Sequence, residues 1–213
     1  MLEGILKMIK FDIFSNYICP YAYRASLWVH QLKEHFGDEI QFAFRHFSLM
    51  QNRFSDGTWQ IWNQPQENEN WQTEKYAFEI HLCRAIEAVR RQGHDNFDKF
   101  HVALFEARHN NPKRDLKNDE AIRRVAEKIG VDMAQFKADI HDSMILKQVG
   151  IDHLHAVEEL GVFGTPTFVF TACEPMYLKL ERRLSMKESL DFWDVFYQTV
   201  AKHPYVLEMK RPN

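Results

Sequence analysis

The chain has 213 residues, a length that suits one domain or a core that carries one large insertion. Hydrophobic residues make up 45% of the sequence and aromatic residues 14%, which is enough apolar material for a sizeable core and excludes a disordered chain. Acidic and basic residues are mixed along the sequence with a formal net charge of −3, so nothing in the charge pattern favours a nucleic-acid partner.

The first fifty residues show the pattern of a β-α-β unit. Residues 8–14 predict a buried strand, and residues 39–47 alternate with period two and predict a second one. Between them, Pro20 suits the first position of a helix, whose apolar spacing continues over residues 21–36 until Gly37 ends it. A crossover of this kind makes the two strands parallel.

A long helical block is expected to follow. Residues 48–73 are polar and predict an irregular or partly helical connection. Helical spacing and turn residues then predict helices over residues 74–92, 95–109, 117–129, 132–142 and 143–160.

Strand patterning returns near the end of the chain. Residues 166–171 and 176–180 predict two paired strands, and a final helix follows over residues 186–202. The order β-α-β, helical block, β-β-α predicts an α/β, thioredoxin-like fold. Its thioredoxin-like domain would consist of residues 1–50 and 161–213, with residues 51–160 as an inserted helical domain.

Two motifs lie at the joints of this predicted core. Residues 11–20 read FDIFSNYICP, and residues 161–169 read GVFGTPTFV. The first resembles the strand-to-active-site segment D-x-x-S-D-x-x-C-P-W-C of DsbA-like proteins, particularly their FrnE-type branch, and the second resembles the G-V-x-G-T-P-T-F segment of the same family. The resemblance covers essentially the whole chain and extends to the related 2-hydroxychromene-2-carboxylate isomerases. It implies a catalytic Cys19 and a cis bond between Thr165 and Pro166.

The position of Cys19 suits thiol chemistry. A cysteine at a helix N-terminus meets the positive end of the helix dipole and free backbone N–H groups, which both favour the thiolate. An exposed thiolate is the nucleophile of disulfide exchange. The resemblance implies that Thr165 and Pro166 form a substrate-facing loop beside Cys19.

Four further residues complete the candidate site. Pro20 opens the helix, and Tyr21 belongs to the exposed motif. Ser15 and His46 are additional candidates because they stand near the ends of the two predicted strands.

Ala22 stands where dithiol members of the family have their second cysteine. A mixed disulfide at Cys19 therefore cannot be released within the motif. We predict a thiol–disulfide oxidoreductase-like enzyme that acts through one thiolate and whose mixed disulfide is resolved by glutathione or another thiol.

Two alternatives remain open. The first is a glutathione-dependent transferase or isomerase of the kappa-class or 2-hydroxychromene-2-carboxylate isomerase type, in which Cys19 or Ser15 steadies a glutathione thiolate. The second is a catalytically silent protein that binds a peptide or small ligand.

The remaining chemistry-bearing residues favour structural roles. Cys83 is expected to be buried on its helix, and Cys173 is expected to lie too far from Cys19 to pair with it. The histidines lack metal-ligand spacing, so no metal is expected. Glu87, Arg90 and Arg91 predict an exposed charged face.

Cofactor, partners and compartment are expectations of the same kind. No bound cofactor is expected, and glutathione is a candidate co-substrate. Partners would be protein thiols or disulfides, or a small electrophile, with a homodimer compatible with the sequence. The sparse cysteines and the absence of a long apolar run favour a cytoplasmic protein without a membrane partner.

Overall fold

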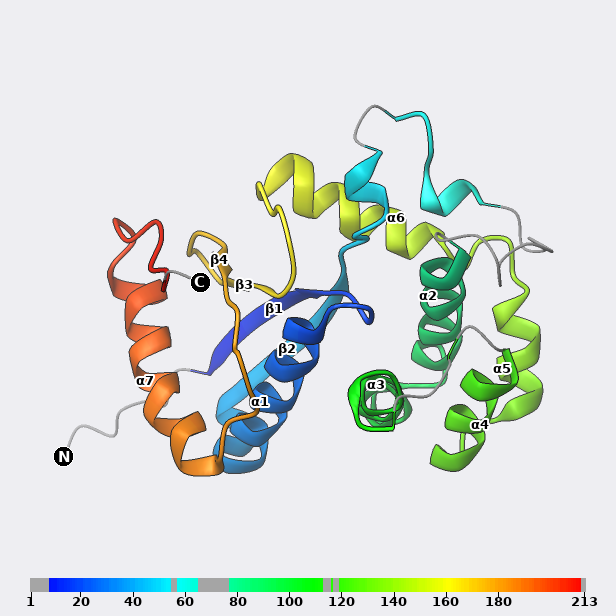
Figure 1. Ribbon diagram of the computed structural model, residues 1–213, viewed down its shortest axis with the longest axis horizontal. Coiled ribbons are helices and arrows are strands. Elements are labelled where there is room, and N and C mark those ends of the chain that lie inside the picture. The colour runs from blue at the N-terminus through cyan, green and yellow to red at the C-terminus, as the bar shows by residue number, and fades with distance from the viewer. Residues whose placement is uncertain (1–7, 55–56, 65–76, 113–115, 117–118, 212–213) are drawn as a thin grey trace.

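A four-stranded mixed sheet lies at the centre of the computed structural model, which describes residues 8–54, 57–64, 77–112, 116 and 119–211 (Figure 1). The helices and strands follow one another as β1 (Ile9–Ser15), α1 (Pro20–Phe36), β2 (Ile40–His46), α2 (Ala77–Arg90), α3 (His94–His109), α4 (Asp119–Ile129), α5 (Met133–Ile140), α6 (Lys147–Leu154), β3 (Thr167–Phe170), β4 (Met176–Tyr177) and α7 (Met186–Lys202).

The strands lie in the order β2-β1-β3-β4. β1 and β2 pair in parallel from Ile9 opposite Ile40 to Ser15 opposite His46, which confirms the predicted β-α-β unit. β3 runs antiparallel to both β1 and β4. α1 therefore crosses from one parallel strand to the next and begins directly beyond the carboxyl end of β1, where the thiol motif lies.

The second predicted hairpin is shorter than expected. β4 ends at Tyr177, so the prediction of a strand over residues 176–180 is wrong for its second half. Beyond β4, the carbonyl of Leu180 accepts a hydrogen bond at 2.9 Å from the Arg24 guanidinium on α1 instead of continuing the strand pairing. Residues 178–180 consequently run past the N-terminal part of α1.

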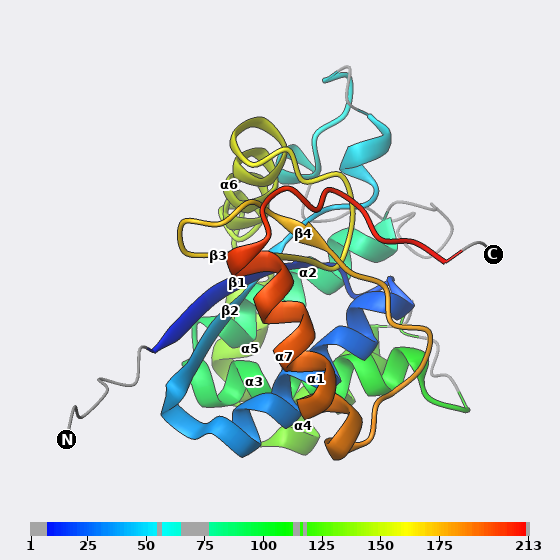
Figure 2. The same cartoon turned by 90° about the vertical axis from the view of Figure 1, so that its left-hand side faces the viewer.

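Helices α1 and α7 cover one face of the sheet (Figures 1 and 2). The indole of Trp28 on α1 donates to the carbonyl of Ser189 on α7 at 3.1 Å, and its ring meets Phe168 of β3 edge to face. Phe11 of β1 packs against Trp193 of α7 on the same side. Burial of these large aromatic rings is the main favourable term for this layer.

The other face of the sheet has its own smaller core. Alternate residues of a strand point to opposite faces, so Phe14 lies on the face away from Phe11. It packs with Phe47, Ala156 and Val162, which belong to the end of β2 and to the segment after α6. The sheet is thus buried on both faces, and the carboxyl end of β1 lies between two layers.

Helices α2 to α6 stand between β2 and β3 in the chain, and Figure 1 shows α2 to α5 gathered away from α7. Their bounds agree with the predicted block except near its end. The predicted helix over 143–160 is replaced by a turn, α6, and a π-helical turn at His155–Glu159. The turn forms because the Asp142 carboxylate accepts the backbone N–H of Met144 at 2.9 Å, which competes with helix formation.

The polar connection after β2 contains two short 3-10 helices, Gln51–Arg53 and Ile61–Asn63. Residues 55–56 and 65–73 of that predicted connection lie outside the described residues, as do the predicted starts of two helices at residues 74 and 117. No helix in the described segments is both long and apolar enough to cross a membrane.

Candidate functional site

Cys19 occupies the N-cap position of α1, with Pro20 as the first helical residue. Its extended backbone, with φ −86° and ψ 118°, is typical of an N-cap. The backbone N–H of Ala22 points to the sulfur, with 3.5 Å between the nitrogen and Sγ. The helix N-terminus expected from the sequence is therefore present at Cys19, and the thiolate chemistry predicted for this residue stays a prediction.

Asn16 fixes the loop that carries Cys19. Its side-chain amide donates to the carbonyl of Phe47 at 2.9 Å, and its side-chain oxygen accepts the N–H of Ile18 at 3.0 Å. The backbone carbonyl of Asn16 also accepts the N–H of Cys19 at 3.0 Å. The sequence indicates Asn16 as a loop residue, because an asparagine directly after a strand is a known turn signal, but does not show that its side chain fixes the loop.

The loop before β3 lies against the thiol. Sγ of Cys19 lies 3.4 Å from the carbonyl oxygen of Thr165, to which the thiol donates, and the Thr165–Pro166 peptide bond is cis. The Thr165 hydroxyl is buried and has no hydrogen-bond partner among the residues that the structure describes. The two motifs that lie 146 residues apart in the sequence therefore meet at one place.

The rim around this contact is aromatic and partly open. Pro20 is exposed and Tyr21 is half-buried, whereas the side chain of Cys19 is only 7% exposed. Phe163 is 68% exposed, and its ring centroid lies 5.0 Å from that of Tyr177. Neither Phe163 nor Tyr177 was identified from the sequence.

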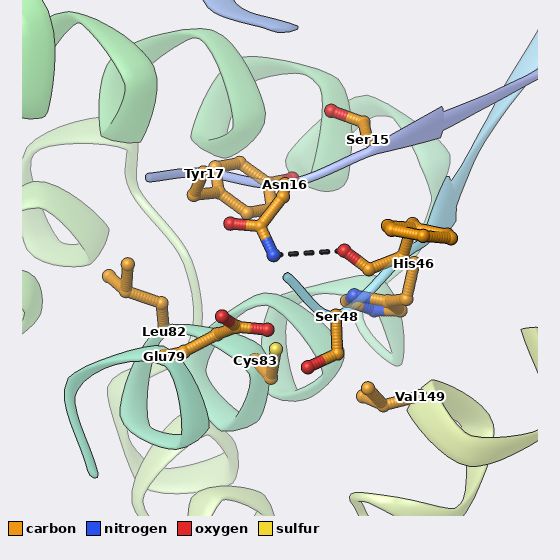
Figure 3. A pocket seen from close by; sticks show the side chains of 10 residues that line it. Ser15, Asn16, Tyr17, His46, Ser48, Glu79, Leu82, Cys83 and Val149 are labelled. Carbon is orange, nitrogen blue, oxygen red and sulfur yellow. Dashed lines mark hydrogen bonds between the residues drawn. The ribbon is translucent and has the colours of Figure 1, made fainter. Parts of the chain in front are cut away.

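Ser15 and His46 lie elsewhere, in the wall of a cavity of about 10 Å³ that has room for about one water molecule (Figure 3). Cys19 is not among the residues that line this cavity. The Ser15 hydroxyl is buried, and no described residue forms a hydrogen bond with it. The structure thus brings Cys19, Thr165 and Pro166 together, and the predicted roles of Ser15 and His46 stay predictions.

His46 is held by a buried hydrogen bond to Glu87 on α2. Its Nε2 lies 2.7 Å from Oε1 of Glu87, which also accepts from Nε of Arg90 at 2.7 Å. Burial alone would raise the pKa of Glu87, but the bonds from His46 and Arg90 outweigh it and lower the pKa to about 2. The prediction that Glu87 is exposed is therefore wrong, because β2 supplies a partner that no helix pattern reveals.

We expect Glu87→Ala to lower the free energy of unfolding at neutral pH by about 3 kcal/mol, the usual cost of removing one partner of a buried ion pair. A carboxylate with a lowered pKa stabilises the fold above its unfolded pKa of 4.5, and that stability is lost as the pH falls towards 2. Urea unfolding at several pH values measures the difference. A loss below about 1 kcal/mol at neutral pH would contradict the structural role of this pair.

Glu79 and Cys83 project from α2 towards Asn16 and Ser48 at the same cavity (Figure 3). Oε2 of Glu79 accepts the N–H of Met50 at 3.1 Å, while Oε1 has no hydrogen-bond partner within the described part of the chain. Burial raises the pKa of Glu79 from 4.5 to about 7, although Ser48 and Asn16 partly offset the rise. Burial likewise raises the pKa of Cys83, so this thiol is a poor nucleophile.

We expect Glu79→Gln to remove a pH dependence of stability. Between pH 4.5 and 7 the folded protein keeps the proton on Glu79 while the unfolded chain loses it, so the free energy of unfolding falls as the pH rises. The loss is on the order of 3 kcal/mol. Urea unfolding near pH 5 and pH 8 measures, for each protein, how much the free energy of unfolding changes with pH. The difference between the two proteins isolates Glu79, because the other titrating groups contribute equally to both. Equal slopes would show that Glu79 is not a buried acid.

All three cysteines, Cys19, Cys83 and Cys173, are unpaired. Ala22 is buried and occupies the position in the first turn of α1 where a second thiol would face Cys19. Within the described ranges, no three histidine, cysteine or carboxylate side chains lie close enough together to hold a metal ion. What the site offers is one thiol, a helix N-terminus and an adjacent carbonyl.

The chain is similar in sequence to a known family of proteins. The sequence model of the family described as the DSBA-like thioredoxin domain matches residues 10–192. An uncharacterized protein of Mycobacterium tuberculosis is 25% identical over 207 residues, which span 97% of this chain and 83% of that relative.

Solved structures share the fold. The thiol-disulfide oxidoreductase MdbA of Actinomyces oris superimposes with a TM-score of 0.60 at 20% identity, covering 88% of this chain and 81% of its own. A thioredoxin-like oxidoreductase of Silicibacter pomeroyi gives 0.54 at 19% identity, with 89% and 87% covered. A 2-hydroxychromene-2-carboxylate isomerase gives 0.60 at 13% identity, with 94% and 100% covered. The predicted α/β thioredoxin-like fold is confirmed.

Proposed function

Since the chain belongs to the DSBA-like thioredoxin domain family, we propose that it carries out thiol–disulfide exchange through Cys19 alone, with an external thiol completing each cycle. The observation that carries this proposal is the position of Cys19 Sγ between the Ala22 N–H and the Thr165 carbonyl, on a helix turn without a second cysteine. A sulfur in this position can attack a disulfide but has no neighbouring thiol to release the product.

The reaction has two steps that balance without a further oxidant. In the first, the Cys19 thiolate attacks one sulfur of a disulfide, a new disulfide forms at Cys19, and the other half leaves as a thiolate. In the second, an external thiolate such as that of glutathione attacks the mixed disulfide, takes its outer half and frees Cys19. A cycle that depends on external glutathione suits the reducing cytoplasm.

The Thr165 carbonyl has a defined part in this sequence. It accepts a hydrogen bond from the Cys19 S–H in the resting protein, with 3.4 Å between the sulfur and the oxygen. When Cys19 forms a disulfide it no longer donates, and the carbonyl becomes able to accept a backbone N–H from a substrate. The same carbonyl would therefore accept first from the thiol and then from the bound substrate, whether that substrate is a protein disulfide or glutathione.

Turnover with a glutathionylated substrate tests the proposal. The mixed disulfide of glutathione and 2-mercaptoethanol is offered with excess glutathione, and glutathione reductase with NADPH reports the oxidised glutathione formed. We expect a rate proportional to protein concentration, with the two-substrate pattern of a covalent intermediate. A rate equal to the uncatalysed one would overturn the proposal. Glutathione-dependent conversion of a small electrophile in its place would identify a transferase or isomerase.

A further inference from the structure

The segment after β4 carries a lysine to the rim of the thiol site. The backbone N–H of Leu178 donates to the carbonyl of Pro166 at 3.1 Å, and the carbonyl of Leu180 accepts from Arg24 on α1 at 2.9 Å. Lys179 stands between these two attachments. Its backbone is thus fixed to the proline loop on one side and to the first turns of α1 on the other.

The ammonium group of Lys179 lies over two aromatic rings of the rim. Its Nζ is 5.1 Å from the ring centroid of Tyr21 and 5.4 Å from that of Tyr177. These are cation–π distances, and the side chain remains exposed. A hydrogen bond with Tyr177 raises the pKa of Lys179, and the nearby Cys19 and Tyr21 act in the same direction. The lysine is therefore a fixed positive charge beside the thiol.

A second cation shares the same ring. The guanidinium carbon of Arg24 lies 5.4 Å from the centroid of Tyr21. Among the described residues neither Arg24 nor Lys179 forms a salt bridge, whereas Lys187 on α7 pairs with Asp191 at 2.8 Å. The rim beside Cys19 thus has two positive charges that form no salt bridge with a carboxylate of the described segments. Such charge raises the local concentration of anions and their rate of encounter.

We propose that Lys179, supported by Arg24, selects disulfides that carry carboxylates over neutral and cationic ones. The inference rests on the proposed exchange at Cys19 and names the class of its substrate. Oxidised glutathione has this chemistry, because each half carries two carboxylates and one ammonium group. The step is the one already written, in which Cys19 takes one half of the disulfide and the other half leaves as a thiolate.

Rates of mixed-disulfide formation at Cys19 test the selection. Three probes are used at low salt: oxidised glutathione, neutral hydroxyethyl disulfide and cationic cystamine. Each rate is read by intact mass and divided by the rate of that probe with free N-acetylcysteine. We expect Lys179→Gln to lower the ratio of the glutathione rate to the hydroxyethyl rate about 3- to 10-fold, and to raise the cystamine ratio. Lys179→Arg, which keeps the positive charge, should show the same rate ratios as the wild-type protein.

Lys187→Gln is the matched control because it removes one exposed positive charge elsewhere. Its helix contacts α1 near Trp28, nine residues and about 13 Å along the helix from Cys19. The control should leave the ratios unchanged, and 0.5 M salt should reduce the wild-type preference. Unchanged ratios in Lys179→Gln, or equal losses in both variants, would overturn the inference and leave the exchange reaction intact. No adduct with any probe would overturn the proposed function itself.

Discussion

Replacing Ala22 by cysteine is expected to convert the one-thiol site into a self-contained disulfide pair. Ala22 lies three residues after Cys19, on the first turn of α1, and its N–H already faces Sγ at 3.5 Å. Residues three apart on a helix have Cα atoms about 5 Å apart, within the range that a disulfide bridges. The new thiol would attack the mixed disulfide at Cys19 and release the bound half within the molecule.

Intact mass measures this conversion directly. After treatment with oxidised glutathione, wild-type protein should carry one glutathione on Cys19. Ala22→Cys protein should carry no glutathione at this pair and should be two hydrogens lighter than its reduced form, because an internal disulfide has formed. Ala25→Cys is the matched control, because Ala25 is equally buried on α1 but lies six residues, about 9 Å, from Cys19. Ala22→Cys protein that keeps its glutathione as wild type does would contradict the proposed geometry.

Replacing Cys19 by serine is expected to abolish both the glutathione adduct and turnover. A hydroxyl is not deprotonated by a helix N-terminus alone and cannot form a disulfide. The fold should survive, because serine is a good N-cap and accepts the Ala22 N–H in place of sulfur. The expected cost in stability is about 1 kcal/mol. Cys173→Ser, which changes a half-buried cysteine elsewhere, should leave turnover unchanged.

The serine variant also separates the two enzyme classes. Loss of all activity supports exchange at sulfur. Retained conversion of a small electrophile, dependent on reduced glutathione, would mean that the group at position 19 only steadies a glutathione thiolate. That result would replace the exchange reaction by the transferase or isomerase reaction as the function of this site.

Much of the core follows from local signals. Pro20 and Gly37 limit α1 because one lacks an N–H and the other, at φ 55°, takes a backbone conformation that side chains disfavour. Period-two patterning located β1, β2 and β3, and the crossover rule set the parallel pair. The proximity of Cys19 and Thr165 could be predicted only from the family resemblance, because no local sequence pattern relates residues that are 146 positions apart.

The parts that sequence reasoning missed depend on contacts between distant segments. Glu87 and Arg90 are spaced like a solvated helix face, and only the approach of His46 from β2 explains why Glu87 is buried. Lys179 reaches the rim because β4 ends early and Arg24 holds the following segment. A sequence pattern predicts which face of an element is apolar, but not which polar group another element brings to it.

Whether Cys19 alone reacts is measured by the site and number of glutathione molecules that wild-type protein takes up from oxidised glutathione, found by intact mass and peptide mapping. The half-buried Cys173 and the deeply buried Cys83 serve as internal controls, because each is another cysteine with which oxidised glutathione could react. We predict one glutathione per chain, attached to Cys19 and removed by reduced glutathione. An unmodified Cys19, or a glutathione found on Cys173 alone, would contradict the account of this protein as a one-thiol exchange enzyme.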